Sequence, residues 1–143
     1  MFIGEYQHTL DEKGRMAIPQ KFRGAFTSGA VVTRGLDGCL FIYPMTEWQN
    51  IAEKLMSLPI TKGDARAFAR HMLSGAMEVS LDSQGRVLLP EYLREYAGVR
   101  KEAVIAGLYN RLEVWSSETW GKYQAETEKS AEAIAENLEG FSI

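Results

Sequence analysis

The segment LDEKGRMAIPQKFR, residues 10–23, returns as LDSQGRVLLPEYLR, residues 81–94, and this repetition decides the fold. When residues 4–26 are set over residues 75–97 without a gap, seven of the 23 positions are identical. The match then resumes farther along each copy, and it ends with Trp48 answering Trp120. Such an ordered series of matches indicates a tandem duplication of about 70 residues.

Each copy begins with a strand that leads into a tight turn. Alternation of apolar and polar residues predicts a half-buried strand, with inward positions at Tyr6, His8, Leu10, Val79 and Leu81. The Asp-x-x-Gly sequence then predicts the turn. The side chain of Asp11 can accept hydrogen bonds from the backbone amides ahead of it, and Gly14 can adopt a positive φ. Asp82 and Gly85 repeat this pattern in the second copy.

An apolar strand and a short helix follow each turn. Residues 16–18 continue as a strand that ends at Pro19, because proline has no amide hydrogen for a sheet but suits the first turn of a helix. We expect a short helix over residues 20–26, with Phe22 facing inward. The second copy predicts the same series in the strand 87–89, Pro90, the helix 91–97 and the inward residue Leu93.

Two more strands and a longer helix complete each copy. The expected strands are residues 31–33, 40–43, 104–106 and 112–115, with hairpin signals at Asp37-Gly38 and at Asn110. Thr46 and Gln49 have the spacing of a capping box, so the first longer helix is expected to begin there and to end before Pro59. The second is expected from about Glu118 through Leu138. Residues 64–73 predict a helix between the copies, with Phe68 and Met72 on its apolar side.

The composition is that of a soluble globular protein in a reducing cytoplasm. Hydrophobic residues make up 45% of the chain and charged residues 24%. No apolar run reaches the roughly 20 residues that span a bilayer, and the amino terminus lacks the features of a signal peptide. A single cysteine, Cys39, cannot form an internal disulfide. We therefore expect no membrane association.

The net charge of −3 is unevenly distributed, which matters for a nucleic-acid partner. Residues 11–34 contain five basic and two acidic side chains, whereas residues 113–143 contain seven glutamates and two lysines. The first stretch can therefore meet phosphate, provided that the acidic end of the chain lies elsewhere.

The loop Asp-x-x-Gly-Arg has two interpretations. The aspartate and the arginine could simply pair across a turn, which would stabilise a surface loop by about 0–1 kcal/mol. However, turn chemistry explains only the aspartate and the glycine, and nothing in a turn requires arginine at both Arg15 and Arg86. Arginine is the side chain best able to bind phosphate or a guanine edge through two hydrogen bonds, so a binding role is favoured.

The run Leu-Asp-x-x-Gly-Arg-x-x-x-Pro-x-x-x-Arg resembles the swapped-hairpin DNA-binding domain of the AbrB/SpoVT type. Its tandem duplication, together with Met-Phe-x-Gly-Glu at the start and residues 33–37 before Cys39-Leu40, resembles the MraZ family over essentially the whole chain. The resemblance implies an α+β fold, in which two tandem swapped-hairpin β-α-β units share one β-barrel-like core with peripheral helices. The expected boundaries are 4–48 for the first unit, 49–74 for connecting helices, 75–120 for the second unit and 121–143 for an acidic helix and tail.

The same resemblance implies a transcription regulator that acts in the cytoplasm at the nucleoid and represses genes. Its partner would be double-stranded DNA, in the form of short direct repeats upstream of the division and cell-wall gene cluster that contains its own gene. Subunits would assemble into a closed, octamer-like ring. No cofactor or metal is implied.

Site residues follow from the resemblance position by position. Arg15 and Arg86 would contact DNA, and Lys13 would touch phosphate, although the second copy has Gln84 there. Lys21 is likewise not kept in the second copy, where the alignment places Tyr92. The side chains expected to shape the loops are Asp11, Gly14, Asp82 and Gly85. Two further arginines match between the copies and are either DNA contacts or members of salt bridges, namely Arg23 and Arg94.

Other functions have less support in the sequence. His8 and His71 are far apart, with His8 expected on the first strand and His71 on the middle helix, and no cluster has metal-ligand spacing. Cys39 is expected to be a small packed side chain rather than a nucleophile. The tryptophans and Tyr123 indicate a core or a subunit interface more than a platform for stacking bases. The alternative functions are a ring-forming or antitoxin-like interaction module without an operator and, with less support, RNA binding.

Overall fold

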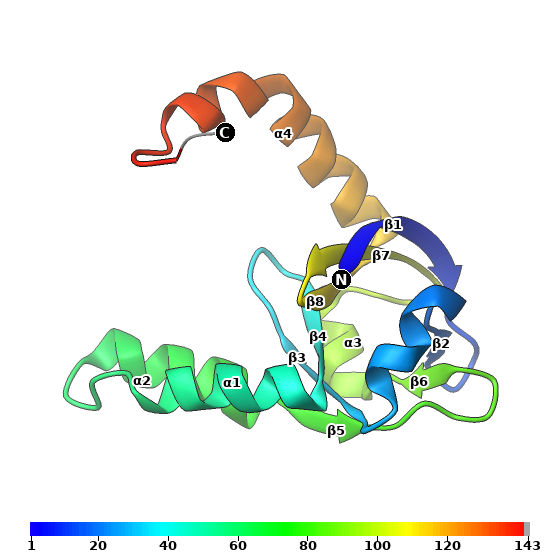
Figure 1. Ribbon diagram of the computed structural model, residues 1–143. Helices are drawn as coiled ribbons and strands as arrows, with labels where there is room; N and C mark the ends of the chain where they lie inside the picture. Colours follow the sequence, from blue (N-terminus) through cyan, green and yellow to red (C-terminus); the bar gives the residue numbers. More distant parts are fainter. Residues whose placement is uncertain (142–143) are drawn as a thin grey trace.

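A computed structural model describes residues 1–141 and has an α+β fold (Figure 1). The first repeat contains β1 (Phe2–Thr9), β2 (Arg15–Ala17), the 3-10 helix η1 (Gln20–Phe26), β3 (Ala30–Arg34), β4 (Leu40–Pro44) and α1 (Met45–Met56). The second contains β5 (Met77–Val79), β6 (Arg86–Leu88), α3 (Glu91–Ala97), β7 (Glu102–Tyr109), β8 (Arg111–Ser116) and α4 (Ser117–Glu136). They are joined by α2 (Gly63–Ala69) and the π-helical turn η2 (Arg70–Ser74).

The main sheet is built by exchange between the two repeats. Its strand order is β1-β7-β8-β4-β3-β5. When each strand is replaced by its counterpart in the other repeat, the same order is read from the opposite end of the sheet. The first strand of each repeat pairs with the third strand of the other, β1 with β7 and β5 with β3. At the centre β4 pairs with β8, and Phe41 lies opposite Glu113. The sheet therefore has approximate twofold symmetry, and neither repeat completes it alone.

The second strands of the two repeats form a separate ribbon that follows the same symmetry. β2 pairs with β6, with Met16 opposite Val87. The backbone amide of Ile18 donates to the carbonyl of Gly85 at 2.9 Å, and the amide of Leu89 donates to that of Gly14 at 3.0 Å. These reciprocal bonds confirm the expected exchange of hairpins between the units.

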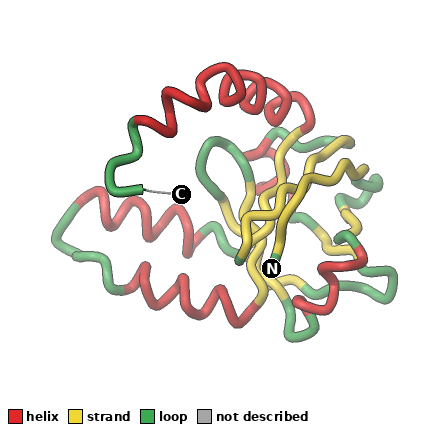
Figure 2. Tube along the Cα trace, turned by 45° about the horizontal axis from the view of Figure 1, so that its top comes forward, coloured by secondary structure: helices red, strands yellow, loops and turns green. Residues whose placement is uncertain are grey.

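One hydrophobic core serves both repeats. Phe22 and Leu93, expected to face inward, are both buried in it. Met16 and Val87 are fully buried where the ribbon crosses the core. The tube view shows the strands gathered into a single body (Figure 2). The shared core is thus confirmed, but β1 and β5 remain at opposite ends of the sheet, so strand pairing in residues 1–141 does not close a barrel.

The longer helices extend from this body in different directions. α1 and α2 lie side by side and project to one side, whereas α4 leaves the body separately near β1 (Figure 1). A second buried cluster, which includes Cys39 and Trp115 with Trp48 and Trp120 packed against it, lies at the base of these helices. This confirms that the tryptophans belong to packed structure. No helix of residues 1–141 is long and apolar enough to cross a membrane.

Several local predictions are corrected by the structure. The capping box at Thr46 is wrong: α1 begins at Met45 directly after Pro44, and no side chain caps it. The strand turns straight into the helix there, so Thr46 already lies in the first turn. The residue that matches Pro44 in the second repeat is Ser116, whose side chain accepts a hydrogen bond from the amide of Thr119 and caps α4.

Two other helices and one turn also differ from expectation. The helix expected over 64–73 is divided into α2 and the wider turn η2, in which Met72 is buried while Phe68 stays exposed. α4 ends at Glu136, so Leu138 lies beyond it. In the hairpin between β7 and β8 the positive φ belongs to Tyr109, the residue before Asn110.

Candidate nucleic-acid interface

The first loop, residues 11–15, is organised by the carboxylate of Asp11. Its Oδ1 accepts hydrogen bonds from the backbone amides of Lys13 at 3.0 Å and Arg15 at 2.9 Å. Its Oδ2 accepts one from Nε of Arg15 at 2.6 Å. Gly14 adopts a φ of +84°, as the turn prediction requires. One carboxylate therefore holds both the backbone of the loop and its arginine.

The second loop, residues 82–86, repeats this geometry. Oδ1 of Asp82 accepts from the amides of Gln84 and Arg86, both at 2.9 Å, and Oδ2 accepts from Nε of Arg86 at 2.8 Å. Gly85 adopts a φ of +74°. The loops differ at the two positions between the aspartate and the glycine. The shared geometry therefore comes from the aspartate, the glycine and the arginine.

The hydrogen bonds also affect the ionisation of the aspartates. The pKa of Asp11 is lowered, chiefly by the backbone hydrogen bond from Arg15 and less by its side chain, although partial desolvation acts in the opposite direction. The pKa of Asp82 is lowered in the same way, chiefly by the backbone hydrogen bond from Arg86. Both carboxylates are therefore ionised at neutral pH, where they can accept all of these bonds.

The ribbon brings the two loops together although they are far apart in the sequence. Ala17 lies opposite Arg86, and Arg15 lies opposite Leu88. Nη1 of Arg86 reaches to 3.8 Å from Oδ2 of Asp11, across the boundary between the repeats. The side chains of both arginines remain about a quarter to a third exposed, at 34% for Arg15 and 26% for Arg86. The structure thus presents two partly exposed guanidinium groups from one ribbon.

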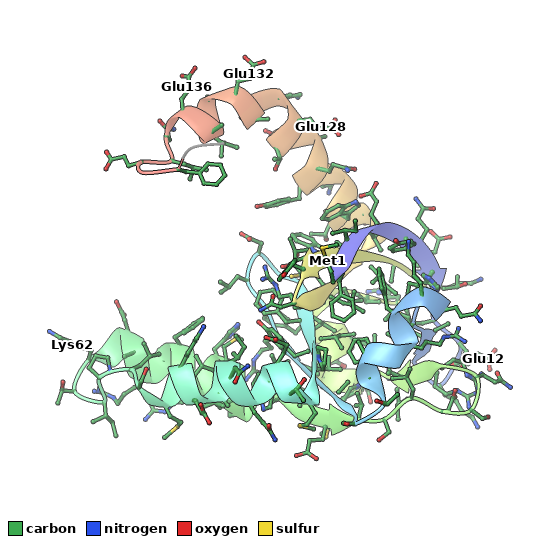
Figure 3. The ribbon with its side chains drawn as sticks, in the orientation of Figure 1. Met1, Glu12, Lys62, Glu128, Glu132 and Glu136 are labelled. Atoms are coloured by element: carbon green, nitrogen blue, oxygen red, sulfur yellow. The ribbon has the colours of Figure 1, made fainter. Side chains whose placement is uncertain are left out.

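These loops lie at an edge of the body away from the helical hairpin that α1 and α2 form. Glu12, in the first loop, is at one side of the molecule, and Lys62, at the far end of the hairpin, is at the other (Figure 3). The glutamates Glu128, Glu132 and Glu136 lie on α4, which rises away from the loops (Figure 3). The acidic helix therefore does not cover the loops in this chain.

Arg23 and Arg94 do not form the salt bridges that were one alternative for them. Within residues 1–141 neither has an ion-pair partner; instead, Nε of Arg23 donates to the carbonyl of Ile18 at 2.8 Å, and Nε of Arg94 donates to that of Leu89 at 2.9 Å. Each guanidinium also lies against the loop glycine of the other repeat. Sequence reasoning missed this contact, although the identity of both arginines and both glycines between the copies was the available signal.

Lys13 and Lys21, the two lysines that the second copy lacks, lie in different surroundings. Lys13 is exposed in the loop. The ammonium of Lys21 lies 4.7 Å from the ring centroid of Tyr6, a cation–π arrangement that the sequence did not reveal. The first repeat thus adds two positive charges that the second, with Gln84 and Tyr92 at the matching positions, does not.

The histidines and the cysteine occupy structural positions. His8 lies on β1, and its pKa is lowered by burial and by the nearby charge of Arg23. His71 contacts the carbonyl of Gly35 through Nε2 at 2.8 Å. Cys39 is fully buried, as expected of a packed side chain, and burial raises the pKa of its thiol to about 12. In residues 1–141 no group of three histidine, cysteine or acidic side chains could hold a metal ion.

Comparison with known proteins finds a family model and full-length relatives. The family model described as "MraZ protein, putative antitoxin-like" matches twice, over residues 1–71 and 72–141. A protein named transcriptional regulator MraZ from Natranaerobius thermophilus is 53% identical over the full length of both chains. Proteins of the same name from Caldanaerobacter subterraneus and Desulforamulus reducens are 50% identical over both full lengths and 51% identical over 96% of this chain and 97% of the relative.

Proposed function

The chain belongs to the MraZ family, and from this premise we propose that it is a transcription regulator that binds double-stranded DNA through its two loops. Relatives of the same length are named as transcription regulators, so the chain is assigned to regulation and not to catalysis. The residues proposed to contact DNA are Arg15 and Arg86, with Lys13 touching phosphate.

The observation that supports this proposal most is the way the loops hold their arginines. In each loop the aspartate accepts from Nε and fixes the plane of the guanidinium. Within residues 1–141 the terminal nitrogens of Arg15 have no hydrogen-bond partner, so they can donate to phosphate or to a base edge. A planar group held in advance loses less side-chain entropy on binding, which favours specific contacts.

Charge in each loop is nearly balanced, which limits what one subunit can achieve. In the first loop two acidic side chains offset Lys13 and Arg15, and in the second Asp82 offsets Arg86. Contacts to phosphate are also weakened steeply by salt. We therefore propose that several linked subunits bind successive direct repeats, because linkage raises the effective concentration of each further loop.

Exposed apolar surface supports self-association into a closed, octamer-like ring. An open cavity of about 240 Å³ lies between α1 and α2, where Met56 and Ile60 are largely exposed. α4 and the residues after it leave Ile134, Leu138 and Phe141 exposed. Exposed large apolar side chains gathered on such helices commonly mark interfaces. Light scattering should show a ring mass that falls in the double variant Ile134→Ser/Leu138→Ser, whereas Lys129→Ser should keep it.

The proposed targets are short direct repeats upstream of the division and cell-wall gene cluster that includes its own gene. Binding there would repress these genes, in the cytoplasm at the nucleoid. A footprint over that upstream region should show protection at regularly spaced repeats. Protection at a single site, or none, would contradict this part of the proposal.

DNA binding is tested by anisotropy with a labelled duplex from that upstream region and a random duplex of equal length. The protein should bind the upstream duplex at least tenfold more tightly, and Arg15→Ala or Arg86→Ala should remove most of that preference without altering the mass of the assembly. Lys62→Ala, which removes one exposed positive charge on the side of the molecule opposite the loops, is the control and should bind normally. Normal binding by both loop variants would show that the loops are not the interface.

A second candidate is an antitoxin-like interaction module, which the wording of the family description favours. Such a protein would keep its assembly and would bind the upstream duplex no more tightly than the random one. If single-stranded RNA competed better than either duplex, RNA would be the partner instead.

A further inference from the structure

We propose that Arg23 and Arg94 are positioning residues, each of which clamps the DNA-binding loop of the opposite repeat and so fixes the spacing of Arg15 and Arg86. This inference rests on the proposed function for the role of the loops. It assigns to these arginines a role other than contact with phosphate.

The contact is clearest at Arg94, in α3 of the second repeat. Its Nε donates to the carbonyl of Leu89 at 2.9 Å, while the amide of Leu89 donates to the carbonyl of Gly14 in the first loop at 3.0 Å. The guanidinium then lies over Gly14 itself: a Cβ added there would come within 2.6 Å of Nε and 2.7 Å of Cζ. Gly14 is therefore held between a backbone hydrogen bond and a planar side chain from the other repeat.

Arg23 makes the reciprocal contact. Its Nε donates to the carbonyl of Ile18 at 2.8 Å, and the amide of Ile18 donates to the carbonyl of Gly85 at 2.9 Å. A Cβ added to Gly85 would collide with Nε and Cζ of Arg23 and would lie 2.6 Å from its Cδ. The same three groups, an arginine, the residue that follows a ribbon strand and a loop glycine, thus occur twice with the repeats exchanged.

The two loop glycines have a role beyond backbone conformation. Gly98 also has a positive φ, of +66°, but a Cβ there would meet nothing within 4 Å. Gly14 and Gly85 combine a positive φ with close contact to an arginine, so a side chain at either position would displace the guanidinium. Because each arginine crosses between repeats, displacing it would let the two loops shift relative to each other.

A double-mutant cycle on the full-length protein tests this without DNA. Gly85→Ala should lower the urea midpoint by less when Arg23→Ala is present than in the wild-type background, because the collision is gone. It should lower the midpoint equally with or without Arg94→Ala, whose side chain contacts the other loop. Gly14→Ala should couple to Arg94→Ala and not to Arg23→Ala. Coupling within a repeat, or none at all, would overturn the clamp.

The salt dependence of binding to the upstream duplex separates positioning from direct contact. For a positioning residue, Arg23→Lys should weaken binding several-fold with an unchanged slope against salt, because lysine keeps the charge but has no Nε to donate to Ile18. Lys13→Gln, which copies Gln84 of the second loop, should instead reduce the slope by about 0.9, as loss of one phosphate contact does.

In this second experiment one result would overturn the positioning role, and another would overturn the proposed function. Normal affinity of Arg23→Lys, combined with a reduced slope in Arg23→Gln, would assign Arg23 to phosphate contact and overturn the positioning role. If the wild-type protein did not bind the duplex at all, the proposed function would fail, while the urea cycle would still decide whether the clamp exists.

Discussion

The carboxylate of Asp11 in the first repeat lies within 3.8 Å of the guanidinium of Arg86 in the second, in addition to its 2.6 Å contact with Arg15. Within residues 1–141 the symmetric ion pair between Asp82 and Arg15 is not formed. One carboxylate thus faces two arginines, and the other faces one. The two loops are therefore unequal in their contacts as well as in their lysines.

This asymmetry predicts that Asp11→Asn is more damaging to specificity than Asp82→Asn. Each change adds one positive charge and should strengthen binding to random DNA. Asp11→Asn, however, weakens the hold on Arg15 and also removes the second ion pair of Arg86, which Asp82 still holds through Nε. The ratio of upstream to random affinity should therefore fall further than in Asp82→Asn. Competition binding with the two duplexes measures this ratio, and equal ratios for the two variants would contradict the role of the shared carboxylate.

The loop glycines should be more sensitive to alanine than a glycine in open space. Gly98→Ala should cost about 1 kcal/mol of unfolding free energy, from its positive φ alone. Gly14→Ala should cost roughly 1 kcal/mol more, because the hydrogen bond of Arg94 is also lost. Urea denaturation of the two variants compares them directly. Equal costs would show that the arginine moves aside without penalty.

The carboxylates of Asp11 and Asp82 should stay ionised at pH values below the ordinary pKa of aspartate. The pKa values of Asp11 and Asp82 are lowered from 3.8 in the folded protein, so their ionised forms stabilise the fold above 3.8. This contribution declines as the pH falls below 3.8 and is lost once the pH passes the lower folded pKa. NMR titration of the side-chain carboxyl carbons should give midpoints below 3.8 for both residues. A midpoint at or above 3.8 would contradict the hydrogen-bonding pattern.

Cys39 should be unreactive while the protein is folded. It is fully buried, and a thiol whose pKa is raised to about 12 has almost no thiolate at neutral pH. Alkylation by iodoacetamide at pH 8, followed by mass spectrometry, should therefore be slow in buffer and fast in denaturing urea. Rapid alkylation of the native protein would mean that the second cluster opens readily.

The N-termini of α1 and α4 offer a pair of variants that tests side-chain capping. Ser116→Ala removes the hydroxyl that accepts from the amide of Thr119, so it should cost about 1 kcal/mol of stability. Thr46→Ala removes a hydroxyl that caps nothing and should change stability by less than about 0.5 kcal/mol. Thermal unfolding of both variants provides the comparison. A larger loss of stability for Thr46→Ala than for Ser116→Ala would show that Thr46 does cap α1, as the sequence predicted.

Local sequence signals were sufficient wherever the responsible atoms are close in the chain. The turns at Asp11 and Asp82 depend on hydrogen bonds that span at most four residues. The hairpin at Asp37-Gly38 likewise depends on two adjacent residues with positive φ. The same reasoning failed at Thr46, because where α1 begins is set by the end of a buried strand that pairs with β3 and β8.

The sequence by itself determined the duplication, the paired loops and the residues within each loop, since the same aspartate, glycine and arginine make the same local hydrogen bonds in both copies. Only the tertiary structure decided which groups meet across the repeats. Strand pairing places Gly14 under Arg94, Gly85 under Arg23, and Arg86 beside Asp11. No spacing in the chain encodes these contacts, because they depend on the exchange of strands that buries one core common to both repeats.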